Sequence, residues 1–362
     1  MPRIVLDMND RRPVWAMPDW VPARIADALP EGWELQVMEE LTDGSGDGAG
    51  RVSPAVREAV ADAEVYLGYG IDAELLEAGS DLEWVHSGAA GVGSSLTPTM
   101  KASSVVFTNS AGIHAPPMAE TVLAMVLHFG RGLDFALRNQ ARRVWSTDAY
   151  YVAGAPLREL SRMTVGLLGF GGIGREVARR VGSLGARVLG LKRTPPEPGE
   201  ADLAPVAGGG SLAERIELLH GEAGLDRLLA ESDVLVLCAP ETDETRGILN
   251  SDALARMKAG ALVVNVGRGK LVEMDALVEA LRDGRLRGAG LDVFPSEPLA
   301  ADHPLWDLPN VVLTPHVSAV THAFWERETE LILHNLRCHL EGADPHRPAG
   351  PWRNVVDKEA GY

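Results

Sequence analysis

The stretch that decides the fold is Val165-Gly166-Leu167-Leu168-Gly169-Phe170-Gly171-Gly172-Ile173-Gly174-Arg175-Glu176-Val177-Ala178. A short apolar run typical of a buried strand meets three glycines in the G-x-G-x-x-G spacing, and a helix-forming segment follows. Such glycines permit a tight turn, let the backbone approach a pyrophosphate, and let the helix pack on the strand. The helix N-terminus adds free N–H groups and partial positive charge. The motif predicts dinucleotide binding by Gly169, Phe170, Gly171, Gly172, Ile173 and Gly174.

The composition describes a globular chain and excludes several classes of partner. Its 362 residues are enough for two domains, and no apolar run approaches the roughly 20 residues that span a bilayer. Two cysteines cannot form a disulfide framework, which favours a reducing, cytoplasmic compartment. The net charge, 34 − 51 = −17, argues against nucleic acid and anionic membranes as partners. A small anionic ligand stays possible because local charge can differ from net charge.

The first third of the chain alternates strands and helices. Apolar runs predict strands at 4–6, 35–38, 63–67, 82–86 and 105–108, and residues 23–29 have helical spacing. The stretch 42–51 is rich in Gly, Asp and Ser and predicts a loop. This part therefore predicts a small parallel α/β domain.

A second series of strands surrounds the glycine motif. An apolar helix is expected at 118–130, strands at 187–191, 233–238, 261–265, 288–292 and 311–314, and an insertion loop at 200–210. A helix at 326–340 is expected to return to the first domain. The fold prediction is thus α/β, with two Rossmann-like domains, doubly wound parallel sheets and the cofactor in the cleft between them. The expected domains are 1–115 with 322–362, which would bind substrate, and 116–321, which would bind the dinucleotide.

The end of the strand after the glycine helix bears on the choice of cofactor. An NAD site usually has Asp or Glu there to bind the ribose 2′-hydroxyl, whereas this chain has Lys192 and Arg193. Cations can bind a 2′-phosphate that a carboxylate would repel. We therefore expect NADP(H) to be preferred, with NAD(H) possible. The alternative is that both are solvated loop charges.

Three polar stretches follow strands of the predicted nucleotide fold, at 265–272, 291–299 and 313–319. They contain one arginine, one glutamate and one histidine, which suffice for carbonyl reduction of a 2-oxo acid. Methyltransferases also use glycine motifs of this kind but do not need these three residues. An isolated arginine or histidine after a strand is often only structural, so the set carries the prediction.

The chain here resembles the D-isomer-specific 2-hydroxyacid dehydrogenase family over nearly its whole length. The family patterns N-x-x-R-G-x-x-V, L-D-V-F-x-x-E-P-L and T-P-H match Asn265–Val272, Leu291–Leu299 and Thr314–His316. The resemblance implies the catalytic residues Arg268, Glu297 and His316. Arg268 would bind the substrate carboxylate, His316 would exchange a proton with the 2-oxygen, and Glu297 would orient His316.

The resemblance also implies further contacts. Those to the cofactor are Ala239, Pro240, Val266 and Asp292, although Asp292 can equally be a strand-end cap. Substrate would be held by Arg268, His316 and the backbone of Ala90, Gly91 and Val92, in a loop where Gly93 replaces the family's usual aspartate. No metal is expected. Residues 118–145 resemble the family's dimer-forming region, which implies a homodimer.

The expected activity is hydride transfer between nicotinamide and a small 2-oxo or D-2-hydroxy acid. The leading form is NADPH-dependent reduction of a glyoxylate- or hydroxypyruvate-like substrate. A 3-phosphoglycerate-type dehydrogenase is one alternative. The other is an NAD(H)-sensing interaction protein similar to the family's corepressors, which keep their catalytic motifs.

Overall fold

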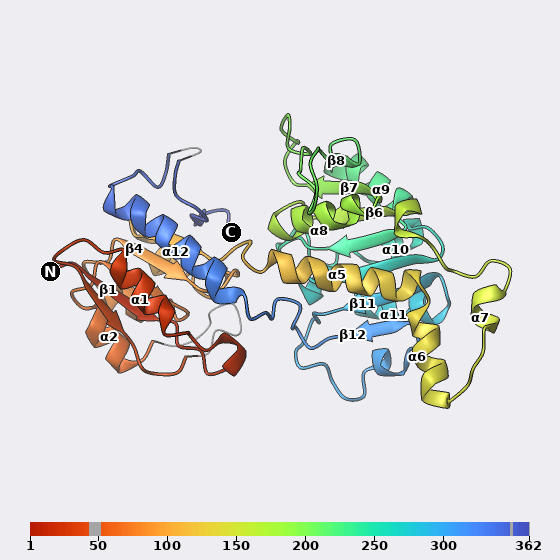
Figure 1. Cartoon of the computed structure of the whole chain (residues 1–362), viewed down its shortest axis with the longest axis horizontal. Helices are drawn as coiled ribbons and strands as arrows, with labels where there is room; N and C mark the ends of the chain where they lie inside the picture. The colour runs from red at the N-terminus through yellow and green to blue at the C-terminus, as the bar shows by residue number, and fades with distance from the viewer. Residues whose placement is uncertain (43–51, 348–349, 362) are drawn as a thin grey trace. The chain divides into compact units, whose positions relative to one another are not determined.

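The computed structural model describes residues 1–42, 52–347 and 350–361, so most of the predicted loop at 42–51 lies outside the described residues. The chain forms two compact units, Met1–His114 with Val320–Tyr362, and Ala115–Ala319. Each is built on a parallel sheet flanked by helices, which confirms the predicted α/β class (Figure 1). Within the described ranges, no helix is long and apolar enough to cross a membrane.

The sheet of the first unit has the order β2-β1-β3-β4-β5 and is parallel throughout. Its strands are β1 (Arg3–Asp7), β2 (Glu34–Val37), β3 (Val65–Gly68), β4 (Trp84–Ser87) and β5 (Val106–Asn109). The accompanying helices are η1 (Pro13–Trp15), α1 (Trp20–Asp27), α2 (Pro54–Val60), α3 (Ala73–Ala78), α4 (Pro98–Ala102) and α12 (Phe324–Leu340).

Both faces of this sheet are buried. Tyr66 of β3 packs on the side of α2, α3 and α4, whereas its neighbours Val65 and Leu67 pack on the side of α1 and α12. This alternation follows from the two-residue period of a strand. Helix α12, from the end of the chain, therefore forms part of the first unit's core.

The sheet of the second unit has the order β12-β11-β10-β9-β6-β7-β8 and is also parallel. Its strands are β6 (Thr164–Leu168), β7 (Arg187–Lys192), β8 (Ile216–His220), β9 (Val234–Leu237), β10 (Ala261–Asn265), β11 (Leu286–Leu291) and β12 (Val311–Leu313). The order reverses between β6 and β9, and ligands of such sheets bind at that point, beyond the carboxyl ends of the strands.

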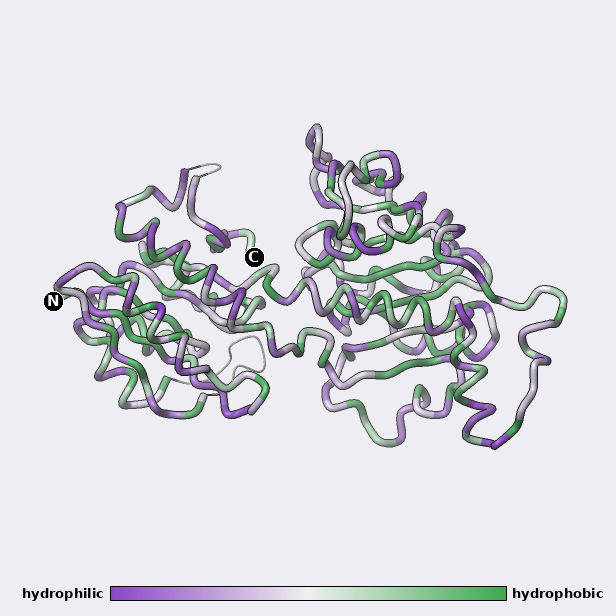
Figure 2. The backbone as a smooth tube through the Cα atoms, viewed as in Figure 1, coloured by the Kyte–Doolittle hydropathy of each residue, from purple (hydrophilic) through white to green (hydrophobic). Residues whose placement is uncertain are grey.

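Helices cover both faces of the second sheet. Helices α5 (Ala115–Gly130) and α8 (Gly172–Ser183) pack on one face, and α9 (Gly221–Glu231), α10 (Ser251–Arg256) and α11 (Met274–Arg282) on the other. Figure 2 shows the central strands as hydrophobic along their length. The shorter elements are α6 (Leu133–Arg142), α7 (Asp148–Tyr151), η3 (Leu160–Arg162), η4 (Gly269–Leu271) and η5 (Pro304–Asp307). Polar residues of the central strands therefore lie at the strand ends.

The strand β8 is one element that the sequence analysis did not predict. Its apolar residues are interrupted by Glu217, which obscures the pattern of a buried strand. The strand lies at the sheet edge and pairs only with β7, and there Glu217 forms ion pairs with Arg187 and Arg227. An edge position thus accommodates a charge that a central strand would exclude.

Candidate active site

The turn after β6 needs glycine at two motif positions because of the fold itself. Gly169 has a φ of +105°, and a Cβ there would lie 2.8 Å from the amide nitrogen of Ala239. A Cβ on Gly174 would lie 2.3 Å from the carbonyl oxygen of Gly169. The segment after β9, which contains Ala239 and Pro240, therefore lies directly against the glycine turn.

Gly171 has no such internal reason to be glycine. A Cβ at Gly171 would meet no described atom within 4 Å, and its φ of −83° is open to any residue. Helix α8 starts here without a side-chain cap, whereas α2, α3, α4 and α10 each have one. An open backbone and an uncapped first turn fit a pyrophosphate group, which would use both.

Other predicted cofactor residues offer their backbone only. Phe170 and Val266 are buried in the second unit's core, so their side chains are occupied by packing. The thiol of Cys238 donates a hydrogen bond to the Gly169 carbonyl at 3.2 Å, and burial raises its pKa to about 12. This cysteine therefore stays a neutral thiol that supports the glycine turn.

Arg268 lies in a tightly fixed loop after β10. The Asn265 side chain accepts a hydrogen bond from the Gly267 amide at 3.1 Å and donates one to the Arg268 carbonyl at 3.0 Å. A Cβ on Gly269 would lie 1.9 Å from the carbonyl carbon of Phe294. The Arg268 loop therefore packs directly against the loop that carries Glu297, and this close approach requires glycine at 269. The sequence analysis did not explain that requirement.

Glu297 and His316 form a direct pair. His316 Nδ1 lies 2.8 Å from Glu297 Oε2, and Glu297 Oε1 accepts a hydrogen bond from the Phe294 amide at 2.9 Å. The glutamate is therefore held from its own loop while it orients the imidazole. The His316 side chain is 50% exposed, and no described protein group is hydrogen-bonded to its Nε2. This nitrogen is available to a ligand.

Asp292 anchors the loop that presents His316. Its carboxylate is fully buried and accepts three hydrogen bonds, from Thr314 Oγ1 at 2.6 Å, Val317 N at 2.9 Å and Ser318 N at 3.0 Å. His316 has a φ of +55°, a strained value for a residue that is not glycine. These bonds are those of a strand-end cap, the alternative role considered for Asp292.

The structure gives Lys192 a partner that the sequence did not show. Its ammonium forms an ion pair with Glu200, and Glu200 also accepts a hydrogen bond from Arg175 at 2.8 Å. Arg193, the second cation predicted to bind a 2′-phosphate, is exposed at the start of the same loop. Sequence reasoning missed Arg175 and Glu200, although Arg175 directly follows the third glycine of the motif.

In the first unit, the predicted substrate loop follows β4. The Ala90 carbonyl accepts a hydrogen bond from Asn109 Nδ2 at 2.8 Å, and the Val92 carbonyl accepts from the amides of Ser95 and Leu96, each at 3.0 Å. Within the described chain, the amides of Ala90, Gly91 and Val92 donate to no protein acceptor. Consecutive free amides of this kind can bind an anion.

A buried polar network lies at the base of this loop, where β4 ends. Ser110 Oγ donates to the Ser87 carbonyl at 2.8 Å and also contacts both carboxylate oxygens of Glu328, at 3.0 and 2.9 Å. His86 Nε2 lies 2.8 Å from Glu328 Oε1, and its Nδ1 lies 2.8 Å from Thr108 Oγ1. The network links β4, β5 and α12, and its four side chains are fully buried.

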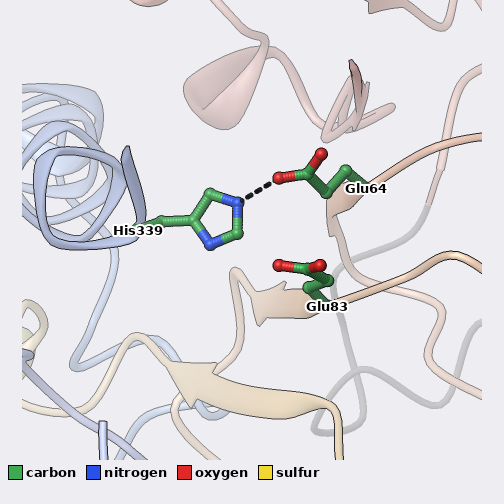
Figure 3. Close-up of side chains that lie close together, drawn as sticks. All are labelled: Glu64, Glu83 and His339. Carbon is green, nitrogen blue, oxygen red and sulfur yellow. Dashed lines mark hydrogen bonds and ion pairs between the residues drawn. The ribbon is translucent and has the colours of Figure 1, made fainter. Parts of the chain in front are cut away.

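Glu64, Glu83 and His339 form a separate group at the other edge of the same sheet. Figure 3 shows His339 reaching from α12 toward the two carboxylates, and their potential ligand atoms lie within 4.8 Å of one another. His339 Nε2 lies 2.9 Å from Glu64 Oε1, and its ring packs beside Trp33, Trp84 and Trp352. Because Glu83 is exposed and the ring is held by packing, the hydrogen bond between His339 and Glu64 accounts for the arrangement.

Arg268, Glu297, His316 and the glycine motif all belong to the second unit, at the carboxyl edge of its sheet. Such an edge, beside the switch point and with an uncapped helix facing it, is that of a dinucleotide-binding α/β protein. Comparison with known proteins identifies the family. The D-isomer specific 2-hydroxyacid dehydrogenase NAD-binding domain matches residues 123–318, more than half of the chain.

Two curated relatives and one solved structure extend this match. A glyoxylate reductase from Thermococcus onnurineus is 35% identical over 76% of this chain and 78% of its own length. A D-3-phosphoglycerate dehydrogenase from Mycobacterium tuberculosis is 34% identical over 75% of this chain but only 48% of its own length. The structure of an NADPH-dependent glyoxylate/hydroxypyruvate reductase from Sinorhizobium meliloti, in complex with NADP and sulfate, is 27% identical, covers both chains fully and has a TM-score of 0.74. The chain belongs to the D-isomer specific 2-hydroxyacid dehydrogenase family.

Proposed function

We propose that the chain reduces a small 2-oxo acid, of the glyoxylate or hydroxypyruvate type, to the corresponding 2-hydroxy acid with a nicotinamide cofactor, preferring NADPH. The observation that carries this proposal is the His316–Glu297 pair, at 2.8 Å, on the same sheet edge as Arg268 and the open glycine turn. Relatives that match along most of their own length include reductases of such acids.

The residues of the second unit divide the work of reduction. When bound at the glycine turn, the cofactor would supply the hydride. Arg268 would bind the carboxylate and polarise the 2-oxo group with its planar fork of donors. His316, held by Glu297 through Nδ1, would donate its proton from Nε2 to the oxygen of the reduced carbonyl. In oxidation of the hydroxy acid, the same nitrogen would accept that proton.

The first unit has its own group of donors suited to an acid. The free amides of Ala90, Gly91 and Val92 are suited to bind a carboxylate oxygen without any side-chain charge. The domain roles expected from the sequence, with substrate binding in the first unit and dinucleotide binding in the second, remain part of this proposal.

We also propose a cytoplasmic homodimer. The segment from α6 to α7 projects from the second unit in Figure 1, and it exposes a group of large apolar side chains. These are Leu133, Leu137, Val144, Trp145, Tyr151 and Val152, of which Trp145 is 98% exposed. An exposed apolar group of this size is typical of an interface between subunits. Light scattering would give a mass near twice that of one chain.

The two alternatives receive less support. The 3-phosphoglycerate dehydrogenase relatives continue well beyond the part that matches this chain, whereas the glyoxylate reductases match over most of their length. A sensing role would not require His316 Nε2 to be available to a ligand, and the structure leaves it available.

Absorbance at 340 nm tests the proposal directly. NADPH and NADH are each offered with glyoxylate, hydroxypyruvate, pyruvate and 3-phosphohydroxypyruvate, and we expect turnover with the first two and a higher kcat/KM for NADPH. The matched pair Arg268→Ala and Arg282→Ala separates the site from general effects, because Arg282 lies at the end of α11. Full turnover by Arg268→Ala would contradict the assignment. No turnover with any substrate, in protein that binds NADPH, would favour the sensing alternative.

A further inference from the structure

A cluster of charged side chains lies at the carboxyl end of β7. Arg175 comes from the first turns of α8, Lys192 is the last residue of β7, and Glu200 comes from the loop between β7 and β8. The Glu200 carboxylate takes a hydrogen bond from Arg175 Nη2 at 2.8 Å and from the Glu197 amide at 3.1 Å, and it pairs with Lys192. Glu200 therefore pairs with two cations at once.

This place in the fold is where the cofactor's adenosine ribose is recognised. In sheets of this kind, an acidic residue at the end of the second strand binds the ribose 2′-hydroxyl, and a cation there accommodates a 2′-phosphate. The chain has Lys192 at the strand end, and its loop returns a carboxylate to the same ammonium eight residues later. The cluster thus contains both the cations that a 2′-phosphate needs and a carboxylate that would repel it.

The pair between Lys192 and Glu200 is more enclosed than the pair between Arg187 and Glu217. The side chains of Lys192 and Glu200 are 17% and 12% exposed, whereas those of Arg187, at the opposite end of β7, and Glu217, in β8, are 46% and 44% exposed. Burial alone would raise the pKa of Glu200, but hydrogen bonds from Lys192 and the Glu197 amide outweigh it and lower the pKa. The carboxylate is therefore ionised at neutral pH.

We propose that Glu200 determines cofactor specificity by competing with the 2′-phosphate for Lys192 and Arg175. The inference rests on the proposed binding of a nicotinamide dinucleotide at the glycine turn. A 2′-phosphate has to displace the carboxylate before it can pair with both cations. A cofactor with only a 2′-hydroxyl leaves the three side chains in place. Glu200 thus holds the preference for NADPH over NADH below the value that Lys192 and Arg175 alone would give.

Calorimetric titration with two fragments tests the competition without any turnover. Adenosine 2′,5′-bisphosphate and 5′-AMP differ only in the 2′-phosphate. In Glu200→Gln we expect the bisphosphate to bind about tenfold more tightly, because two charge-assisted bonds become available to it, and 5′-AMP to bind within about twofold of wild type. The ratio of kcat/KM for NADPH to that for NADH should rise by a similar factor.

Glu217→Gln is the matched control. Glu217 also pairs with two guanidinium groups, those of Arg187 and Arg227, and its substitution changes the net charge equally. Glu217 lies in β8 and pairs with Arg187 at the start of β7, away from the strand end that carries Lys192, so both fragments should bind as in wild type. An equal gain for the bisphosphate in this control would mean that net charge, and not Glu200, is responsible, and would overturn the proposal.

Three other outcomes are decisive. Unchanged or weaker binding of the bisphosphate by Glu200→Gln overturns the competition while leaving cofactor binding intact. Weaker binding of 5′-AMP by that variant also overturns it, since Glu200 would then be a ligand of the ribose hydroxyl. If wild-type protein binds neither the fragments nor NADPH, the proposed function fails at its first step and the inference fails with it.

Discussion

Replacing Asp292 by asparagine tests whether the site depends on the anchor beneath His316. The carboxylate is fully buried and accepts hydrogen bonds from Thr314, Val317 and Ser318. Asparagine keeps one acceptor oxygen, so the bonds on one side can persist in weakened form. Its NH2 group then faces a backbone N–H. That N–H loses its hydrogen bond to a charged acceptor, and two donors then oppose each other.

The expected cost follows from those bonds. A hydrogen bond to a charged group contributes about 1.5–3 kcal/mol, and we expect Asp292→Asn to lower the unfolding free energy by about 3 kcal/mol. For a unit of this size that is roughly 6–12 °C in Tm. The left-handed backbone of His316, with its φ of +55°, persists only while the surroundings impose it. A displacement near 1 Å at the proton donor can reduce kcat about a hundredfold.

The assay compares Asp292→Asn with Asp302→Asn, which removes an exposed carboxylate from the nearby loop. Calorimetry gives Tm, steady-state kinetics give kcat and KM, and fluorescence titration gives Kd for NADP+. We expect lower Tm and kcat for Asp292→Asn, with Kd within about threefold of wild type. Weakened NADP+ binding with an unchanged kcat would refute the role of Asp292 as an anchor of the His316 loop. It would favour direct contact between Asp292 and the cofactor.

Three further predictions use other contacts. Gly171→Ala should keep its Tm but bind NADP+ at least tenfold more weakly in a titration, whereas Gly269→Ala should lower Tm by calorimetry because its Cβ meets backbone. Burial raises the pKa of Asp7 to about 6. The unfolding free energy of the wild type should therefore fall by about 3 kcal/mol as pH rises from about 4 through 6. Urea denaturation of Asp7→Asn should show no such fall. Glu328→Gln should lower the urea midpoint and raise KM for the 2-oxo acid; an unchanged midpoint would count against the network's role.

Much of the fold follows from local patterns in the sequence. Central strands such as β6 and β10 are buried on both faces, so their sequences are nearly continuous apolar runs. The glycine motif fixes the turn between β6 and α8. Edge strand β8 escapes this logic because only β7 pairs with it and Glu217 interrupts its apolar run. What decides such a strand is its place in the sheet, which no local pattern records.

Only part of the candidate site could be predicted from the sequence. Glu297 and His316 follow strand ends, and parallel strands bring their carboxyl ends to one edge, so their proximity was a consequence of the topology. The role of Gly269 was not, because its crowding arises from a loop 25 residues further along the chain. Asp292 could be read as a cofactor contact or as a cap, and only its three hydrogen bonds distinguish a cap.

The end of β7 shows why a charge pattern alone is a weak guide to cofactor choice. Lys192 and Arg193 indicate a phosphate site when only their neighbours in sequence are considered. The loop that follows has no regular periodicity, and its return to β7 depends on Glu200 meeting Lys192 and Arg175 together. A cation already paired with a carboxylate binds phosphate only by exchange, and the net gain is the difference between two charge-assisted contacts rather than one of them. Cofactor preference in this chain is therefore set by how firmly the loop holds Glu200, and not by the number of cations at the strand end.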